Sequence, residues 1–201
     1  MAPFAGPAGL GRRAGLAATL GLLLCAVIVL VGGCSIGSSG GSSPVAPDTD
    51  HVPAELIPLF RAAAAAYPSL TPAELAAQAR VESKFDPLAV SRAGARGLMQ
   101  FMPDTWKHFG VDGDRDGRTD PLDPADAIPA AARYEAHLAT LLKAVPGNRL
   151  SLVLAAYNAG PGAVLSARGI PTFDETQDYI SRVRSWALRF GPQFTASRPA
   201  T

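Results

Sequence analysis

The chain has 201 residues and a formal net charge of +1 at neutral pH, and 48% of its residues are hydrophobic. This length accommodates one domain together with additional segments. The near-zero charge gives no reason to expect nucleic acid as a partner. Only two cysteines occur, Cys25 and Cys34, and both precede the region expected to fold, so a disulfide framework is excluded.

The first 34 residues differ from the rest of the chain. Arg12 and Arg13 precede an uncharged apolar run over residues 16–31. Such a run is typical of a signal peptide or a membrane anchor, neither of which is part of a folded domain. Basic residues before the run favour a cytoplasmic N-terminus and export of the chain beyond the run. We therefore expect the body of the protein at the extracytoplasmic face of the cell membrane, with the cytoplasmic membrane as a partner of the N-terminal segment.

Cys34 leaves two modes of attachment open. The sequence VGGCS at residues 31–35 resembles a lipobox, in which the cysteine is lipidated and becomes the new N-terminus after cleavage. Gly32 occupies a position where alanine, serine or threonine is commoner. Residues 1–34 are therefore interpreted either as the signal peptide of a lipoprotein or as an uncleaved anchor.

A linker is expected over residues 35–52, which are rich in glycine, serine and proline. Such a composition cannot bury enough apolar surface to offset the entropy of ordering the chain, so this segment predicts a flexible tether. The folded domain is expected over residues 53–194, followed by a loose tail at 195–201. Its first helix should lie within residues 54–70, with Pro58 causing a kink or a break.

A second helix is expected from residue 72. Thr71 provides an N-cap, Pro72 a first-turn proline and Glu74 the glutamate of a capping box. The pattern should end between Lys84 and Pro87, because the residue before a proline is biased out of helical geometry.

Glu82 is the candidate acid at the end of this helix. At 3.6 residues per turn it shares a stripe with Leu75 and Ala79, on the side expected to face the core. Burial would raise its pKa, which suits a general acid near neutral pH. From periodicity alone, an exposed charge or a partner for Arg80 or Lys84 is the more ordinary interpretation.

The following loop contains Ser91, Gly94 and Gly97, and it leads into Met99 and Gln100. Glycines allow a close approach of the backbone that a side chain would block. Unaided by other information, Ser91 is interpreted as a turn or cap residue. Met99 belongs to an apolar stretch expected to have one side in the core and the other along a groove. A short helix should follow over residues 104–110.

An acidic loop occupies residues 112–123, DGDRDGRTDPLD. Its spacing matches an EF-hand calcium loop, with glycine at position six and acidic residues converging as hard oxygen ligands. The candidate ligands, including the residue at position seven, are Asp112, Asp114, Asp116, Arg118, Asp120 and Asp123. A structural calcium ion is therefore predicted, although position twelve holds aspartate instead of glutamate. The alternative is that Asp123 only caps the next helix, with Pro124 at N1 and Asp126 at N3.

Three further helices complete the predicted all-α domain, which shows no alternating strand pattern. The first should cover residues 124–143 and the second should end at Gly160, with Pro161 stopping it. The last is expected over residues 174–190. In the first of these helices the expected apolar stripe consists of Ala127, Ala131, Tyr134, Leu138, Leu141 and Leu142.

Three blocks of the sequence together carry a resemblance to a known family. They are ESKFDPLAVSRAGARGLMQFMPDTW at residues 82–106, AAYNAGPGAV at 155–164 and ETQDYISRV at 175–183. In this order they resemble the signature of the lytic transglycosylase SLT domain, a lysozyme-like fold related to goose-type lysozymes. The resemblance covers residues 53–194 and implies an all-α lysozyme-like domain that needs no cofactor for catalysis.

The resemblance also implies roles for individual residues. Glu82 matches the catalytic acid of the family. The implied substrate-binding residues are Ser91, Met99, Gln100, Tyr157, Asn158 and Tyr179. Considered without the family, Tyr157 and Tyr179 would be ordinary core residues, and Glu175 a capping-box residue after Thr172.

The implied activity is cleavage of the β-1,4 bond between N-acetylmuramic acid and N-acetylglucosamine in the glycan strands of peptidoglycan, with formation of a 1,6-anhydro ring. A single carboxyl group, Glu82, would act first as acid and then as base, with the substrate acetamido group attacking the anomeric carbon. Two alternatives stay open. One is a goose-type muramidase, in which water intercepts the intermediate, and the other is a non-catalytic module that binds the cell wall.

Overall fold

The computed structural model of the chain describes residues 50–195, which form seven α-helices and no strand. The helices are α1 (Ile57–Ala66), α2 (Pro72–Ser83), α3 (Pro103–Phe109), α4 (Pro124–Leu141), α5 (Arg149–Ala159), α6 (Pro161–Ala167) and α7 (Asp174–Thr195). This confirms the predicted all-α class. The predicted anchor and nearly all of the linker lie outside the described residues. Within residues 50–195, no helix is both long and apolar enough to cross a membrane.

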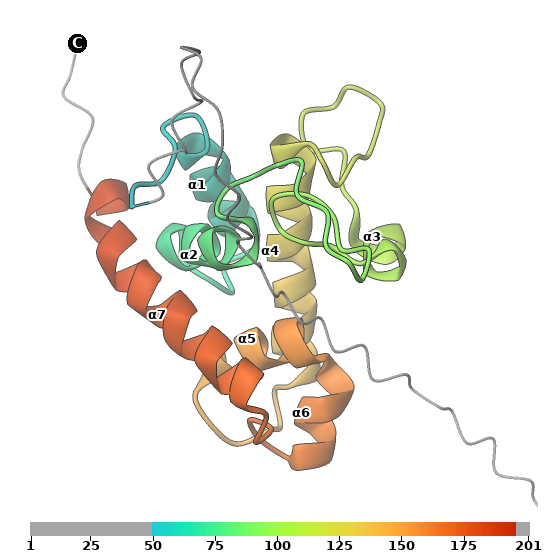
Figure 1. Ribbon diagram of the computed structural model, residues 1–201, viewed down its shortest axis with the longest axis vertical. Helices are drawn as coiled ribbons and strands as arrows, with labels where there is room; N and C mark the ends of the chain where they lie inside the picture. The colour runs from blue at the N-terminus through green and yellow to red at the C-terminus, as the bar shows by residue number, and fades with distance from the viewer. Residues whose placement is uncertain (1–49, 196–201) are drawn as a thin grey trace, which may run out of the picture.

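The helices are arranged around two long ones, α4 and α7 (Figure 1). Helix α1 packs against α4, and α2 packs mainly against α7. Helices α5 and α6 lie together at one end of the domain, where α5 also contacts α7. The N-terminal half of the domain therefore meets its C-terminal helix along α2, the helix that carries Glu82.

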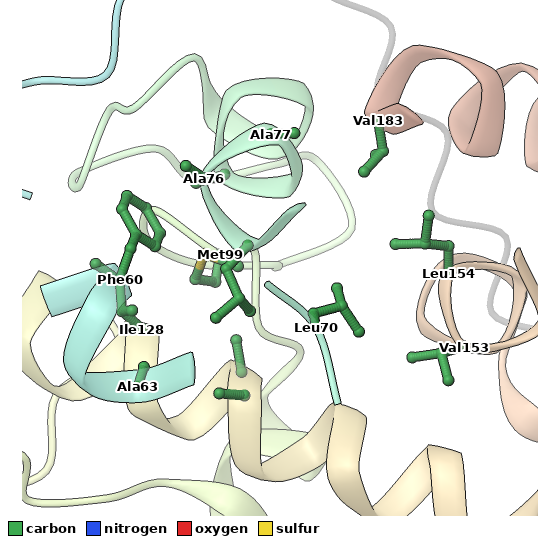
Figure 2. Packing of buried hydrophobic residues seen from close by; sticks show 14 of the residues in the cluster. Phe60, Ala63, Leu70, Ala76, Ala77, Met99, Ile128, Val153, Leu154 and Val183 are labelled. Atoms are coloured by element: carbon green, nitrogen blue, oxygen red, sulfur yellow. The ribbon is translucent and has the colours of Figure 1, made fainter. Parts of the chain in front are cut away.

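The core lies where α1, α2, α4, α5 and α7 converge, and Figure 2 shows part of it. Small side chains occupy the contact surface of α2, where Ala76 and Ala77 are fully buried. Because alanine lets helix backbones approach closely, this helix can pack on several sides at once. The residues labelled around it include Phe60, Ile128, Leu154 and Val183, which come from four different helices.

The sequence interpretation of Pro58 was wrong. Helix α1 begins at Ile57, so the proline lies within its first turn and causes neither a kink nor a break. The first amide groups of a helix have no partner inside the helix, and proline, which has no amide hydrogen, is therefore tolerated there.

The start of α2 is confirmed in detail. The Thr71 hydroxyl accepts a hydrogen bond from the main-chain N–H of Glu74, and the Thr71 N–H donates to the Glu74 carboxylate. The helix ends at Ser83, after which Lys84 and Phe85 both have positive φ angles of 58° and 67°. Phe85 is buried and packs against Phe190 at a ring distance of 5.9 Å. This sharp change of direction leaves Glu82 in the last turn of α2.

The C-terminal part of the domain differs from the prediction in two places. Pro161 does not simply stop α5, because it starts the short helix α6. Helix α7 continues past Phe190 to Thr195 although it contains Pro192. Tertiary contacts hold this extension, since Arg61 donates to the Phe194 carbonyl and the Phe194 ring packs edge-on against Phe60.

One member of the predicted stripe on α4 is misplaced. Leu138 and Leu142 are fully buried, whereas Leu141 is 43% exposed. Leu141 is the last residue of α4. Leu138 and Leu142 occupy the side that faces the core at this end of the helix, and Leu141 lies off that side.

Candidate active site

Glu82 opens into a cleft of about 590 Å³ that lies between α2, α7 and the loop after α2. Its walls come from five helices and one loop, which bring distant parts of the chain together. The lining residues are Val81, Glu82, Ser91, Ala95, Gln100, Phe101, Met102, Thr105, Tyr134, Tyr157, Asn158, Glu175, Asp178, Tyr179 and Arg182. Five of the six predicted substrate-binding residues are among them.

Glu82 has the environment expected of a general acid. Its side chain is half-buried, and Oε1 accepts a 2.7 Å hydrogen bond from the hydroxyl of Tyr179. Burial raises the pKa of Glu82 to about 7, while the Tyr179 hydrogen bond and the positive charge of Arg182 act in the opposite direction. Loss of hydration penalises the charged carboxylate more than these two partners stabilise it. Because this pKa lies near neutral pH, Glu82 can both hold a proton and release it there.

Tyr157 and Asn158 lie side by side at the end of α5, on the cleft wall. The Tyr157 hydroxyl donates to the main-chain carbonyl of Met99 at 2.9 Å, which connects α5 to the loop. The Asn158 side-chain oxygen accepts a 2.8 Å hydrogen bond from the Thr176 hydroxyl. Since its oxygen is already engaged, the amide nitrogen of Asn158 is the group available to donate to a ligand.

Ser91 and Gln100 line the cleft and also form hydrogen bonds within the loop after α2. The Ser91 hydroxyl accepts from the N–H of Ala95 at 3.0 Å, so its interpretation as a turn residue is also correct. Gln100 has a positive φ angle of 49°, and its side-chain nitrogen donates to the carbonyls of Ala89 and Gly97. These bonds fix the loop against itself and leave the amide oxygen of Gln100 as the acceptor that a ligand could use.

Met99 is the predicted binding residue that the structure does not bring to the cleft. Its side chain is fully buried and lies within the core, as Figure 2 shows. The reason is that the loop turns at Gln100, which directs the preceding side chain inward. Met99 contributes to the site only through the carbonyl that receives the Tyr157 hydroxyl.

Helix α7 adds polar residues that the sequence analysis did not assign to the site. Glu175, Asp178 and Arg182 all line the cleft. The capping box predicted for Thr172 and Glu175 was wrong. The carbonyl of Phe173 accepts the first helical hydrogen bond of α7, so Phe173 is the residue that precedes the helix, and Thr172 lies one residue too early to cap it. The three cleft residues are spaced three and four positions apart, which places them on one face of the helix, and this spacing was the available signal.

Two further polar residues lie buried near the acid and had not been expected. Gln78 on α2 and Glu135 on α4 are both fully buried. Glu135 falls on the apolar stripe of α4, four residues after Ala131 and three before Leu138. A carboxylate at such a position was the signal that could have identified it, because buried charges are rare unless they are paired.

The acidic loop brings together a set of carboxylates that differs from the predicted set of candidate ligands. Oxygens of Asp112, Asp114 and Asp126 lie within 4.8 Å of one another. The carboxylate of Asp123 accepts from the Ala125 N–H and caps α4, as the alternative interpretation had it. Of the other predicted positions, Asp116 accepts from the Arg118 N–H, Asp120 accepts from the Leu122 N–H, and the Arg118 side chain is exposed.

Asp126 ties this loop to the start of α4. It is buried, and its two oxygens accept from the N–H groups of Gly113 and Asp120 at 2.7 and 2.8 Å. In addition, Oδ1 of Asp112 is buried without a hydrogen-bond partner in the described part of the chain. A carboxylate oxygen in that situation fits the requirements of a hard cation.

Comparison with known proteins gives one family and several relatives. Residues 58–180 match the family described as "Transglycosylase SLT domain". The chain is 41% identical over 99 residues to the membrane-bound lytic murein transglycosylase F of Maricaulis maris (strain MCS10), and the match covers 47% of this chain and 20% of that protein.

Solved structures support the same relationship. The 70 kDa soluble lytic transglycosylase of Escherichia coli aligns with a TM-score of 0.55 and 28% identity, over 69% of this chain and 24% of that one. An inactive glutamate-to-glutamine mutant of lytic transglycosylase Slt from Pseudomonas aeruginosa aligns with a TM-score of 0.55 and 29% identity, over 71% and 25%. The chain thus spans only a fifth to a quarter of these relatives.

These matches confirm the all-α, lysozyme-like class. The family match at residues 58–180 includes every residue that lines the cleft except Arg182. The matched region extends over more than half of the chain and contains Glu82, Tyr157 and Tyr179. The protein therefore belongs to the transglycosylase SLT domain family.

Proposed function

We propose that the domain is a peptidoglycan lytic transglycosylase, which cleaves the β-1,4 bond between N-acetylmuramic acid and N-acetylglucosamine and leaves a 1,6-anhydro ring. The observation that carries this proposal is Glu82, a half-buried carboxyl group with a pKa of about 7 in a cleft lined by Tyr157, Asn158 and Tyr179. Family membership and the names of its relatives support the same activity.

In the first step, protonated Glu82 donates its proton to the glycosidic oxygen. The acetamido oxygen of the muramic acid residue attacks the anomeric carbon as the bond to the leaving sugar breaks, so the substrate supplies the nucleophile. N-acetylglucosamine departs with a free 4-hydroxyl group, and Glu82 is left as a carboxylate. The 2.7 Å hydrogen bond from Tyr179 then becomes charge-assisted and stabilises this carboxylate.

In the second step, the Glu82 carboxylate accepts the proton of the muramic acid C6 hydroxyl. The C6 oxygen attacks the anomeric carbon and displaces the acetamido oxygen, which closes the 1,6-anhydro ring. Glu82 returns to its protonated form, and no water is consumed. A pKa of about 7 suits both steps, because the same group must give up a proton and then take one back.

The remaining polar groups of the cleft are placed to bind and orient the sugars. Asn158 presents an amide nitrogen, and Gln100 presents an amide oxygen. These neutral groups match the hydroxyl and acetamido groups of a glycan chain. Tyr134, Phe101 and Met102 add apolar wall surface on which sugar rings can pack.

The test replaces the acid without changing its shape. In the purified full-length chain, Glu82→Gln should reduce the release of soluble muropeptides from peptidoglycan by about 10²–10⁴-fold while peptidoglycan is still bound in a sedimentation assay. The matched control is Glu55→Gln, an exposed glutamate outside the cleft. Turnover by Glu82→Gln at the wild-type rate would contradict the proposal. Binding without cleavage by the unmodified chain would favour the wall-binding module instead.

A muramidase of the same fold is the second candidate, and one observation favours it. Glu175 and Asp178 bring two more carboxylates to the cleft, and a hydrolase needs a second group to activate water. If the enzyme is a hydrolase, Glu175→Gln or Asp178→Asn should abolish cleavage. If it is a transglycosylase, both variants should retain formation of the anhydro product, with changes confined to KM.

Attachment to the membrane is part of the proposal. A relative that matches the domain is named as membrane-bound, and residues 1–34 carry the apolar run and Cys34. The catalytic domain would then act from the extracytoplasmic face of the membrane. Fractionation of cells that produce the wild-type chain and Cys34→Ser tests the mode of attachment. If radioactive palmitate labels the wild-type chain but not the variant, the result supports lipidation of Cys34. If the wild-type chain is in the membrane but is not labelled, the result supports an uncleaved anchor.

We also propose a structural calcium ion in the acidic loop, held by Asp112, Asp114 and Asp126. The partnerless oxygen of Asp112 and the convergence of the three carboxylates support it. Calcium should raise the melting temperature of the chelator-treated chain. Asp112→Asn should remove this increase, and the matched control Asp116→Asn, at an exposed aspartate outside the cluster, should retain it. Equal melting temperatures with chelator and with calcium would refute the site.

A further inference from the structure

A buried polar pair lies behind the catalytic acid and has no assigned role. Glu135 and Gln78 are both fully buried. Neither the carboxyl oxygens of Glu135 nor the amide atoms of Gln78 have a hydrogen-bond partner within the described residues. Burying such groups in an all-α core opposes folding, and apolar side chains of similar size would pack there without this cost. Their presence beside the cleft therefore requires an explanation other than stability.

The amide of Gln78 lies near both Glu135 and Tyr179. Gln78 precedes Glu82 by four residues on α2, so its side chain lies one helical turn behind the acid. Its amide approaches both the carboxyl group of Glu135 and the hydroxyl of Tyr179, and each approach influences the pKa of its neighbour. Neither approach reaches the geometry of a full hydrogen bond.

Glu135 is held as a neutral acid. Burial raises its pKa well above the usual range; the nearby amide of Gln78 lowers this pKa, while the negative charges of Glu74 and Glu82 raise it. Tyr157 on α5 is also within electrostatic reach, but its hydroxyl is engaged with a main-chain carbonyl. A neutral carboxyl group carries one O–H donor, and the amide oxygen of Gln78 is an acceptor. The Glu135 O–H can therefore donate to the amide oxygen of Gln78, and the other carboxyl oxygen of Glu135 can accept from the amide N–H.

We propose that Glu135, acting through Gln78, holds the hydroxyl of Tyr179 in place as a donor to the catalytic acid. The chain of donors runs one way. The Glu135 O–H donates to the amide oxygen of Gln78, and the amide N–H of Gln78 donates to the Tyr179 oxygen. The Tyr179 O–H donates to Oε1 of the acid, which is the 2.7 Å bond observed. Glu135 and Gln78 are positioning residues in this scheme, since neither lines the cleft.

The proposal rests on the proposed function and makes a directional prediction. A fixed Tyr179 hydroxyl stabilises the carboxylate that Glu82 becomes in the first step. Without Glu135 that donor is less constrained, so the pKa of Glu82 should rise. The other charged groups facing Glu82, chiefly Arg182, are unchanged. The kcat should fall while KM stays constant, because no substrate contact has been removed.

The experiment compares Glu135→Leu, Gln78→Leu and the double variant with Glu135→Gln in the full-length chain. Glu135→Leu should lower kcat about 10-fold, leave KM unchanged and move the alkaline limb of the kcat profile upward by about one pH unit. Its melting temperature should equal or exceed that of the wild type. Glu135→Gln, which retains a neutral donor, should restore kcat. The double variant should cost no more than either single variant, because both break one chain of bonds.

Three results would overturn the proposal: an unchanged kcat and alkaline limb in Glu135→Leu, a downward shift of that limb, or additive effects in the double variant. A downward shift would mean that Glu135 is ionised and repels Glu82. If Glu135→Leu does not fold, Gln78→Met provides the same test of kcat and pH limb. Titration of the carboxyl carbon of Glu82 by ¹³C NMR needs no turnover. It therefore tests the predicted pKa increase even if the wild-type chain were to prove inactive and the proposed function to fail.

Discussion

The hydroxyl of Tyr179 on α7 donates a 2.7 Å hydrogen bond to the carboxyl group of Glu82 on α2, although the two residues are 97 positions apart in the sequence. The bond exists because α2 and α7 pack against each other. Tyr179 is almost completely buried, at 2% exposure, so its hydroxyl has little choice of partner. Packing between the first half of the domain and its last helix thus fixes the orientation of the Glu82 carboxyl group.

Tyr179→Phe should remove this bond and leave the ring packing intact. We expect kcat to fall about 10-fold and the alkaline limb of the pH profile to move upward, because an ionised Glu82 loses its nearest donor. The control is Tyr67→Phe, at the tyrosine that follows α1 and lies outside the cleft. Wild-type kcat with an unshifted limb in Tyr179→Phe would show that the bond has no catalytic role.

The pH dependence of wild-type cleavage follows from the pKa of Glu82, which burial raises to about 7. The groups facing Glu82 are Tyr179 and Arg182, with Glu135 and Tyr157 at longer range. Only the protonated acid can begin the reaction. Turnover should therefore be constant below about pH 6 and decrease about tenfold per unit well above pH 7. Initial rates on purified peptidoglycan from pH 5 to 9 measure this. Rates that already decrease about tenfold per unit from pH 5 upward, as a pKa near 4.5 would cause, would contradict the buried environment of Glu82.

Thr176→Val tests how Asn158 is oriented. The buried Thr176 hydroxyl donates to the Asn158 side-chain oxygen at 2.8 Å, which keeps the amide nitrogen available in the cleft. Valine has a similar shape but cannot donate, so the amide should lose its fixed orientation. We expect KM for a soluble glycan substrate to rise about 3- to 10-fold with a smaller change in kcat. Thr176→Ser keeps the hydroxyl and should behave as the wild type; equal KM values for Val and Ser would refute this role.

Gly97, in the loop after α2, lies directly against Pro121 of the acidic loop. A Cβ atom at this position would lie 1.7 Å from the carbonyl oxygen of Pro121, and the φ angle of 77° is itself unfavourable for other residues. Gly97→Ala should therefore lower the free energy of unfolding by about 3 kcal/mol or more. Gly94 is the matched control, with a φ angle of 89° but no atom within 4 Å of the added Cβ. Gly94→Ala should cost only about 1 kcal/mol in urea unfolding, and equal costs would exclude the contact with Pro121.

Local sequence signals predicted the helices well where the ends of a helix are determined locally. The capping box of Thr71 and Glu74 and the cap at Asp123 formed as expected, because each joins residues within four positions. Helix α6 and the extension of α7 beyond Phe190 were missed. The latter depends on contacts with α1, more than 130 positions away, such as the bond between Arg61 and Phe194.

The site was predictable to the extent that family motifs describe it. Glu82 and five other residues of the cleft came from the resemblance, since helical periodicity alone would have placed Tyr157 and Tyr179 in the core. Both interpretations hold for Tyr179, which is buried and still reaches the acid. Periodicity could not reveal that Gln78 and Glu135 lie near each other, because this depends on how α2 and α4 meet in space. The same limit explains why Asp126, beyond the twelve-residue loop pattern, was not named as a candidate ligand.

Mass spectrometry of the products released from purified peptidoglycan tests the central claim most directly. The full-length chain should yield muropeptides that end in 1,6-anhydro-N-acetylmuramic acid, and Glu82→Gln should yield none. Products that end in reducing N-acetylmuramic acid, which are heavier by one water molecule, would contradict the transglycosylase assignment and identify a hydrolase.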